Sequence, residues 1–316
     1  VPADVRKLMY KVKYKQGVDI TRIFCGLNDV RNIIPSIKYA KEGGMIPQAT
    51  LCITFSPCHT VEYYSNIADQ LIEAGAPEIC LKDMAGIGRP AFLGKLVKAI
   101  KDKHPEIIIV STAGSADSGK EFDENMKVID ELYPDTIVDE HYYKGDDWFY
   151  THGDRYEPGK VRGAEGKTYD RSNPARVFVG EFANNRTNNA YASTMAEAAY
   201  WTSLERNSDM VVMAAYAPLF CKKGYNKWNS NLIWFDNRGM WRSTNYCYQK
   251  LFSVAGDRAF EMTPAMEGAV ADTTVYMSPT IDTESGEIFI KFVNSECVDK
   301  VFTINTGNKK VYKASV

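Results

Sequence analysis

The stretch EICLKDMAG at residues 78–86 is followed by PAFLGKLVKAIKDKHP at 90–105 and by EIIIVSTAG at 106–114. The first and third stretches are apolar runs that end in polar residues and glycine, which is typical of strands buried on both faces. We interpret the stretch between them as a helix. A strand, a helix and a second strand in this order predict two parallel strands joined by a crossover helix.

The same alternation extends over most of the chain. It predicts the α/β class, with a (β/α)8 TIM-type barrel over residues 1–257. Seven strands are expected in one parallel sheet, closed or nearly so, although a closed barrel of this type needs eight. The predicted strands cover residues 18–24, 48–55, 78–83, 107–112, 135–141, 176–181 and 209–216.

The pattern changes near residue 258. Residues 258–316 alternate apolar and polar side chains and are interrupted by Gly, Pro and Asn, which predicts antiparallel strands. We interpret this part as a partial antiparallel β-sandwich domain. Because a small sheet with open edges is not stable alone, it is expected to pack on the barrel or to be the start of a longer domain.

Composition narrows the classes of function. The 316 residues carry a net charge of −2 and show no basic block, so a nucleic-acid partner is not expected. No apolar run reaches the ~18 residues of a membrane span, and no signal peptide is recognised. The seven cysteines form no CxxC pair and are expected to be mostly reduced. Localisation and a homo-oligomeric state stay open.

Polar side chains follow the predicted strands, where the C-terminal face of a barrel would gather them into a site. They are Asn28, Asp29, Ser56, His59, Lys82, Asp83, Glu140, His141, Glu181 and Tyr216.

Residues from about 104 to 316 carry the stretches TIVDEHYY, DDWFY, VFVGEFA, LERNSDMVVMAAYAPLF, NLIWFDN and YCYQKLFS. In this order they resemble the family 51 glycoside hydrolases, the α-L-arabinofuranosidases. The resemblance implies a retaining glycosidase without a cofactor, acting on an arabinose-containing oligo- or polysaccharide. It also implies that Glu181, at the end of its strand, is the nucleophile.

The resemblance further implies that His141 and either Tyr142 or Tyr143 line the sugar site. Trp148, Tyr216 and Trp228 are candidates for aromatic walls that stack on a sugar, with core packing as the equally weighted alternative.

The acid/base residue is the missing part. The family carries it as the Glu of a Gly-Asn-Glu motif, and no such motif occurs here. Asp83 stands roughly where that Glu would stand, but its side chain is one methylene shorter. Because general acid catalysis contributes ~10²–10⁴-fold, the resemblance implies an impaired hydrolase.

Residues 1–100 resemble a different family. RIFCGLNDVRN, TFSPCHTVEYY and ICLKDMAG are similar to the carboxyltransferase barrel of biotin-dependent enzymes, such as the oxaloacetate decarboxylase α subunit and pyruvate carboxylase. The usual RIFDALND is altered, with Cys25 and Gly26 in place of Asp and Ala. The two resemblances therefore meet near residues 100–106.

In the carboxyltransferases a divalent metal is held by an Asp, a carbamylated Lys and a His-x-His motif. Only the Lys carries over, as Lys82, and the four histidines form no His-x-His, so no bound metal is expected. Two alternatives to a glycosidase stay open. One is a metal-dependent carboxyltransferase or decarboxylase acting on a 2-oxo acid, and the other is a non-catalytic carbohydrate-binding barrel.

Overall fold

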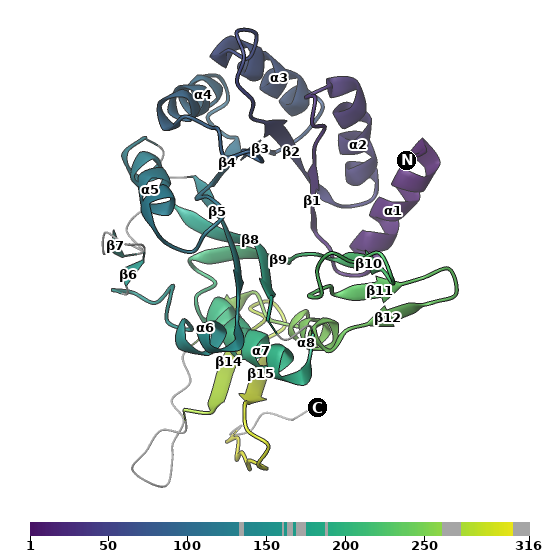
Figure 1. Ribbon diagram of the computed structural model, residues 1–316, viewed down its shortest axis with the longest axis vertical. Helices are drawn as coiled ribbons and strands as arrows, with labels where there is room; N and C mark the ends of the chain where they lie inside the picture. Colours follow the sequence, from purple (N-terminus) through teal and green to yellow (C-terminus); the bar gives the residue numbers. More distant parts are fainter. Residues whose placement is uncertain are drawn as a thin grey trace.

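The computed structural model describes residues 1–132, 136–159, 161–162, 167–168, 175–186, 189–260 and 273–305. Its central feature is one sheet of seven strands, each parallel to its neighbours, that curls around a common centre (Figure 1). The strands, in spatial order, are β1 (Ile20–Ile23), β2 (Ile46–Cys52), β3 (Glu78–Lys82), β4 (Ile108–Thr112), β5 (Ile137–Lys144), β8 (Arg176–Asn184) and β9 (Val211–Tyr216).

The predicted α/β sheet is therefore confirmed, with strand ends that move by a few residues. β5 and β8 run three residues further than predicted, to Lys144 and Asn184. Residue 135, the predicted start of the fifth strand, lies outside the described residues. The extra length includes Tyr143 and Lys144 of β5 and Asn184 of β8.

Helices cover the outside of the curled sheet (Figure 1). Three of them begin at an N-cap residue whose side chain accepts a backbone N–H of the first turn, and these residues are Asp29, Thr60 and Ser243. The helices are α1 (Ala3–Lys15), α2 (Val30–Glu42), α3 (Val61–Glu73), α4 (Pro90–Lys103), α5 (Lys120–Leu132), α6 (Asp146–Thr151), α7 (Tyr191–Arg206) and α8 (Thr244–Phe252). Among the described residues no helix combines the length and apolar character needed to cross a bilayer.

A small sheet continues the barrel beyond β9. It contains β10 (Phe220–Lys222), β11 (Ile233–Phe235) and β12 (Met240–Arg242). β11 is parallel to β10, and the backbone N–H groups of Leu232 and Ile233 donate to the carbonyls of Pro218 and Leu219. Within the part of the chain that the structure describes, β11 pairs with β10 and β12 only, so this small sheet is separate from the seven-stranded one. In the described sheets β12 does not pair with β1, so the barrel is curled but not closed by hydrogen bonds.

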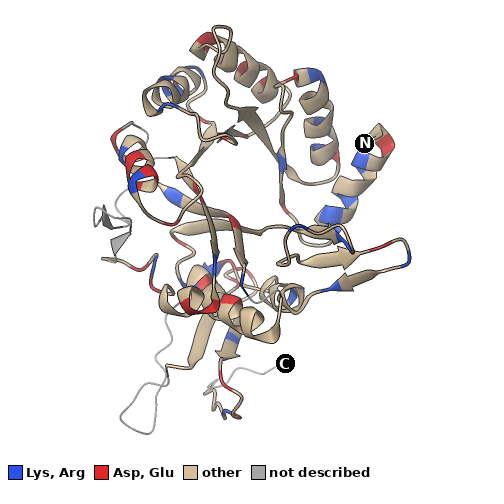
Figure 2. Cartoon of the chain, viewed as in Figure 1, with Lys and Arg blue, Asp and Glu red and all other residues tan. Residues whose placement is uncertain are grey.

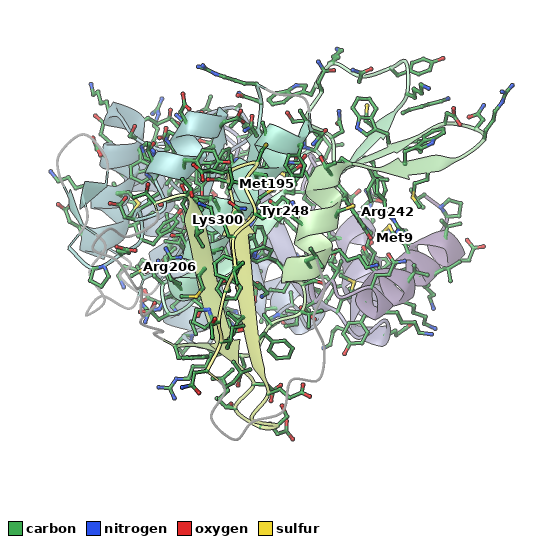
Figure 3. All side chains as sticks on the ribbon, turned by 90° about the horizontal axis from the view of Figure 1, so that it is seen from below. Met9, Met195, Arg206, Arg242, Tyr248 and Lys300 are labelled. Atoms are coloured by element: carbon green, nitrogen blue, oxygen red, sulfur yellow. The ribbon has the colours of Figure 1, made fainter. Side chains whose placement is uncertain are left out.

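The C-terminal strands form a three-stranded antiparallel sheet of β13 (Arg258–Ala259), β14 (Val275–Ile281) and β15 (Ile288–Asn294). It packs against α7, where Lys291 pairs with Glu205 and Arg206 donates to the Met277 carbonyl. Figure 3 shows the sheet beside Arg206 and Tyr248 of the helical layer. The antiparallel prediction is confirmed for these strands, while the division into two domains stays an interpretation. A further pair, β6 (Val161–Arg162) and β7 (Lys167–Thr168), forms a short antiparallel ladder.

Buried apolar side chains form separate clusters on the two sides of the barrel. One is built from residues between 10 and 109, and another from residues between 142 and 232. Charged residues lie mostly on helices and loops (Figure 2). The few charged side chains inside the sheet therefore stand out as candidates for a site.

Candidate active site

Glu181 is placed by a bulge in β8. In the ladder with β5, Glu140 pairs with Val179, but the next pair is His141 with Glu181, so Gly180 is an extra residue. A Cβ atom on Gly180 would lie 1.8 Å from Asp139 Oδ1, which only glycine avoids. Bulges commonly redirect a side chain next to an active site. Here the bulge brings Glu181 directly beside His141.

The Glu181 carboxylate has two partners from β5. Tyr143 Oη donates a 2.8 Å hydrogen bond to Glu181 Oε2, and His141 Nδ1 lies 3.6 Å from the same oxygen. Burial, and then the hydrogen bond to Glu181, raise the pKa of Tyr143, so its hydroxyl keeps its proton and acts as a donor. The Glu181 side chain is 38% exposed, which leaves it open to a ligand.

His141 lies between two carboxylates. On its other side, Nε2 is 3.1 Å from Asp139 Oδ1. Asp139 is buried, and Arg22 Nη1 donates to Asp139 Oδ2 at 2.7 Å. Burial alone would raise the pKa of Asp139, but the contacts with His141 and Arg22 outweigh it and lower that pKa. Asp139 is therefore a fixed negative charge behind the histidine.

Strand alternation separates the two candidate tyrosines. Tyr143 points to the same side as His141, whereas Tyr142 points to the opposite side and is 1% exposed. There Tyr142 Oη lies 2.8 Å from Tyr200 Oη of α7. Tyr143, and not Tyr142, is therefore the neighbour of Glu181, while the role of either tyrosine in lining a sugar site stays a prediction.

The predicted aromatic walls divide in the same way. The Trp228 ring is about half exposed and lies 4.9 Å from the ring of Tyr143, the residue that donates to Glu181. Trp148 donates through Nε1 to Asp117 and stacks on His152, away from that carboxylate. Tyr216 is 9% exposed and packs on the Phe182 ring. The role of all three in sugar binding stays a prediction, and the packing of Trp148 and Tyr216 favours the core alternative.

The Asp83 carboxylate is hydrogen-bonded to the loop that follows it. Its two oxygens accept the backbone N–H groups of Ile87 at 3.1 Å and Gly88 at 2.6 Å. Lys82, the neighbour that the carboxyltransferase resemblance singles out, has Nζ 5.9 Å from the Phe24 ring centroid. The structure shows no bond from either residue to Glu181 within its described part, and the acid role of Asp83 stays a prediction.

The residues after β1 and at the end of β3 do not fit the metal site of the carboxyltransferases. Cys25 stands where that family carries an Asp, and its thiol accepts the N–H groups of Leu27 and Asp29, which lower its pKa. Across the described ranges no three His, Cys, Asp or Glu side chains lie close enough together to hold an ion. A lone Lys82 with a thiol does not make a site for a hard divalent cation, which prefers oxygen ligands.

Two important side chains were not singled out from the sequence. Arg22 is one, although a charged residue inside the apolar run ITRIF is a recognisable signal because an unpaired buried charge is costly. Glu197 of α7 is the other, a fully buried carboxylate that accepts from Asn184 N and Asn245 Nδ2, each at 2.6 Å. Burial raises the pKa of Glu197 to about 7. It fixes the end of β8 to α8.

Comparisons with known proteins find both resemblances. Residues 168–309 match the family model described as the alpha-L-arabinofuranosidase C-terminal domain. An extracellular exo-alpha-L-arabinofuranosidase of Streptomyces chartreusis is 42% identical over 161 residues, which are 51% of this chain and 18% of that protein. A pyruvate carboxylase subunit of Methanocaldococcus jannaschii is 42% identical over 102 residues, 32% of this chain and 18% of that protein.

A solved structure, the arabinose-bound α-L-arabinofuranosidase MgGH51, matches with a TM-score of 0.61 at 22% identity. The match covers 84% of this chain and 46% of that one. It establishes the barrel fold across the junction near residues 100–106. The chain spans less than a fifth of the length of either curated relative.

Proposed function

We propose that the chain is a retaining glycoside hydrolase of the α-L-arabinofuranosidase type, with Glu181 as the nucleophile. The observation that carries the proposal is the arrangement of Tyr143 and His141 around one oxygen of a partly exposed carboxylate on a redirected strand end. The similarity of this part of the chain to an arabinofuranosidase supports the choice of sugar.

In the proposed reaction, Glu181 attacks the anomeric carbon as the bond to the leaving oxygen breaks, and a covalent glycosyl-enzyme forms. Tyr143 donates to Glu181 Oε2 and so orients the carboxylate, leaving the other oxygen for attack. Water then attacks the anomeric carbon, its proton passes to solvent, and arabinose and the free carboxylate are released. The exposed Trp228 ring beside Tyr143 provides an apolar surface for the sugar.

Protonation of the leaving oxygen is the weak step. Both Asp83 oxygens already accept backbone hydrogen bonds, so Asp83 is not presented as a proton donor. Nitrophenolate leaves with little protonation, whereas a sugar alcohol needs it. We therefore expect nitrophenyl arabinofuranoside to be cleaved far better than an arabinose oligosaccharide, by ~10²–10⁴-fold in kcat.

The test compares the two substrates on the chain, on Glu181→Ala and on Glu284→Ala, an exposed Glu in the β14–β15 turn. Glu181→Ala is expected to abolish both activities, and Glu284→Ala to leave them unchanged. An active Glu181→Ala variant contradicts the proposal. Binding of arabinose without turnover of either substrate favours the carbohydrate-binding barrel instead.

A metal-dependent carboxyltransferase is the weaker proposal. It rests on the similarity of residues 1–100 to pyruvate carboxylases, while the described strand ends lack the ligands that its metal requires.

A further inference from the structure

A polar ladder crosses the interior of the barrel and joins its two halves. Arg22, Gln48 and Glu78 are register partners on β1, β2 and β3. Arg22 Nε donates to Gln48 Oε1 at 2.6 Å, and Gln48 Nε2 donates to Glu78 Oε2 at 2.8 Å. The hydrogen bond to Gln48 thus holds the Arg22 side chain in one orientation.

The other end of the guanidinium reaches the proposed active site. Arg22 Nη1 donates to Asp139 Oδ2 at 2.7 Å, across 117 positions of the sequence. The guanidinium also lies over the Phe178 ring at 4.9 Å, which limits its movement from the β8 side. The side chains of Arg22 and Asp139 are only 21% and 6% exposed, so solvent screens this pair little.

Asp139 in turn restricts the position of Glu181 through two contacts. Its Oδ1 lies 3.1 Å from His141 Nε2, and the opposite ring nitrogen of His141 lies 3.6 Å from Glu181 Oε2. The same Oδ1 fills the space above Gly180, the bulge residue immediately before Glu181. A shift of the Asp139 carboxylate would therefore disturb both the histidine ring and the bulge.

We propose that Arg22 is a positioning residue for Glu181, acting through Asp139 and His141. The proposal rests on the proposed function, because it treats Glu181 as the nucleophile. It means that the part of the chain resembling a carboxyltransferase contributes a side chain to the geometry of the arabinofuranosidase-like site. Arg22 touches neither the sugar nor the reacting atoms.

The kinetic test uses Arg22→Met, Arg22→Lys and, as a matched control, Arg31→Met. Arg31 is an exposed arginine of the same region that pairs only with the neighbouring Asp29 among its described contacts. We expect Arg22→Met to lower kcat on nitrophenyl arabinofuranoside by ~100-fold and to leave KM nearly unchanged. A loss of this size is typical when a reacting group is displaced by about an ångström. Arg22→Lys keeps a cation for Asp139 and should retain more of kcat, and Arg31→Met should match the wild type.

Two readouts separate positioning from stabilisation of the fold. Millimolar guanidinium should restore part of the activity of Arg22→Ala and none of that of Glu181→Ala. Thermal melting shows whether each variant is folded at the assay temperature. Wild-type kcat in folded Arg22→Met would overturn the proposal.

A crystal structure of Arg22→Met, or of Arg22→Lys if the first does not fold, measures the positioning directly. The expected result is a His141 ring displaced from Glu181, with the Nδ1–Oε2 separation longer than 3.6 Å. A ring in its original position overturns the proposal. The crystal structure needs no turnover, so it tests the positioning role of Arg22 even if the wild type is inactive. An inactive wild type would refute only the proposed function.

Discussion

The two halves of the barrel are stabilised by different kinds of interior. Between strands β1 and β4 the buried side chains are mainly aliphatic, including the fully buried Leu51, Leu71 and Ile79. The hydrogen-bonded ladder of Arg22, Gln48 and Glu78 is an exception in this half. Around β5, β8 and α7 the interior also holds charged and hydroxyl groups in hydrogen-bonded networks. In one of them, Arg155 and Tyr156 both donate to Glu140 Oε2.

This difference indicates in which half of the barrel the exact position of a side chain matters most for the structure. An aliphatic interior tolerates small shifts, because dispersion and the hydrophobic effect are not directional. A buried polar network fixes the orientation of each member, and loses much of its stabilisation when one partner is removed. The polar half contains Glu181, and the aliphatic half supplies a scaffold and one long-range contact from Arg22.

The largest expected effect tests the polar half. Arg155→Met leaves the buried Glu140 carboxylate without its cation, and should lower the free energy of unfolding by ~3–5 kcal/mol. The double variant Glu140→Leu with Arg155→Met removes both charges and should recover most of that loss. Urea unfolding of the wild type and both variants measures this. A loss below ~1 kcal/mol in Arg155→Met would show that the network is not structurally important.

The matching test in the aliphatic half is Leu71→Ala. Leu71 of α3 is fully buried, and its truncation should cost ~3 kcal/mol by leaving a cavity. Because Leu71 is remote in the fold from Glu181, kcat on nitrophenyl arabinofuranoside should stay unchanged at temperatures where the variant is folded. A large fall in kcat would break the distinction between scaffold and site.

A pH-dependent effect of similar size is expected at Glu197. Its pKa is raised by burial from 4.5 to about 7 in the folded chain, so the folded state binds this proton more tightly than the unfolded state. Stability from this group is therefore fully present below pH 4.5 and is lost as the pH rises through 7. At ~1.4 kcal/mol for each pKa unit, the rise from 4.5 to about 7 gives a loss of roughly 3–4 kcal/mol.

Glu197→Gln removes this titration. Urea unfolding at pH 5 and pH 8 should show the wild type losing stability, relative to Glu197→Gln, at the higher pH. A constant difference between the two proteins at both pH values would contradict the raised pKa.

The smallest effect concerns two thiols of the aliphatic half. Burial raises the pKa of Cys80 to about 11, whereas the backbone N–H groups of Leu27 and Asp29, just before α2, lower the pKa of Cys25. Since the thiolate is the reactive form, iodoacetamide at neutral pH should alkylate Cys25 well before Cys80. Peptide mapping by mass spectrometry measures both. Equal rates would mean that the interior of this half is more open than the structure shows.

Periodicity was sufficient to predict the parallel sheet, because apolar strands that alternate with helices have few other arrangements. It placed Glu181 at the last position of a strand, whereas β8 continues for three more residues, to Asn184. It could not predict the bulge at Gly180, since a glycine inside a strand does not specify which partner residue is skipped. The choice between Tyr142 and Tyr143 depended on the same register, because alternation assigns faces only once the pairing is known.

Contacts between residues far apart in the sequence were the second feature that the sequence could not predict. Arg22 and Asp139 are 117 positions apart, and no local pattern relates them. For Asp83, a strand-end position suggested a catalytic role, but its carboxylate binds the N–H groups of its own turn. Short polar side chains after a strand commonly cap the following loop, so position alone does not distinguish the two uses.

The most direct test of the central claim is covalent trapping with a 2-fluoro arabinofuranoside that carries a nitrophenol leaving group. Such a reagent slows the second step of a retaining mechanism, so the glycosyl-enzyme accumulates and can be located by mass spectrometry. We predict one adduct on the peptide of residues 177–186, on Glu181, and none in Glu181→Ala. An adduct on another carboxylate, or hydrolysis by the wild type with inversion at the anomeric carbon, would contradict the account.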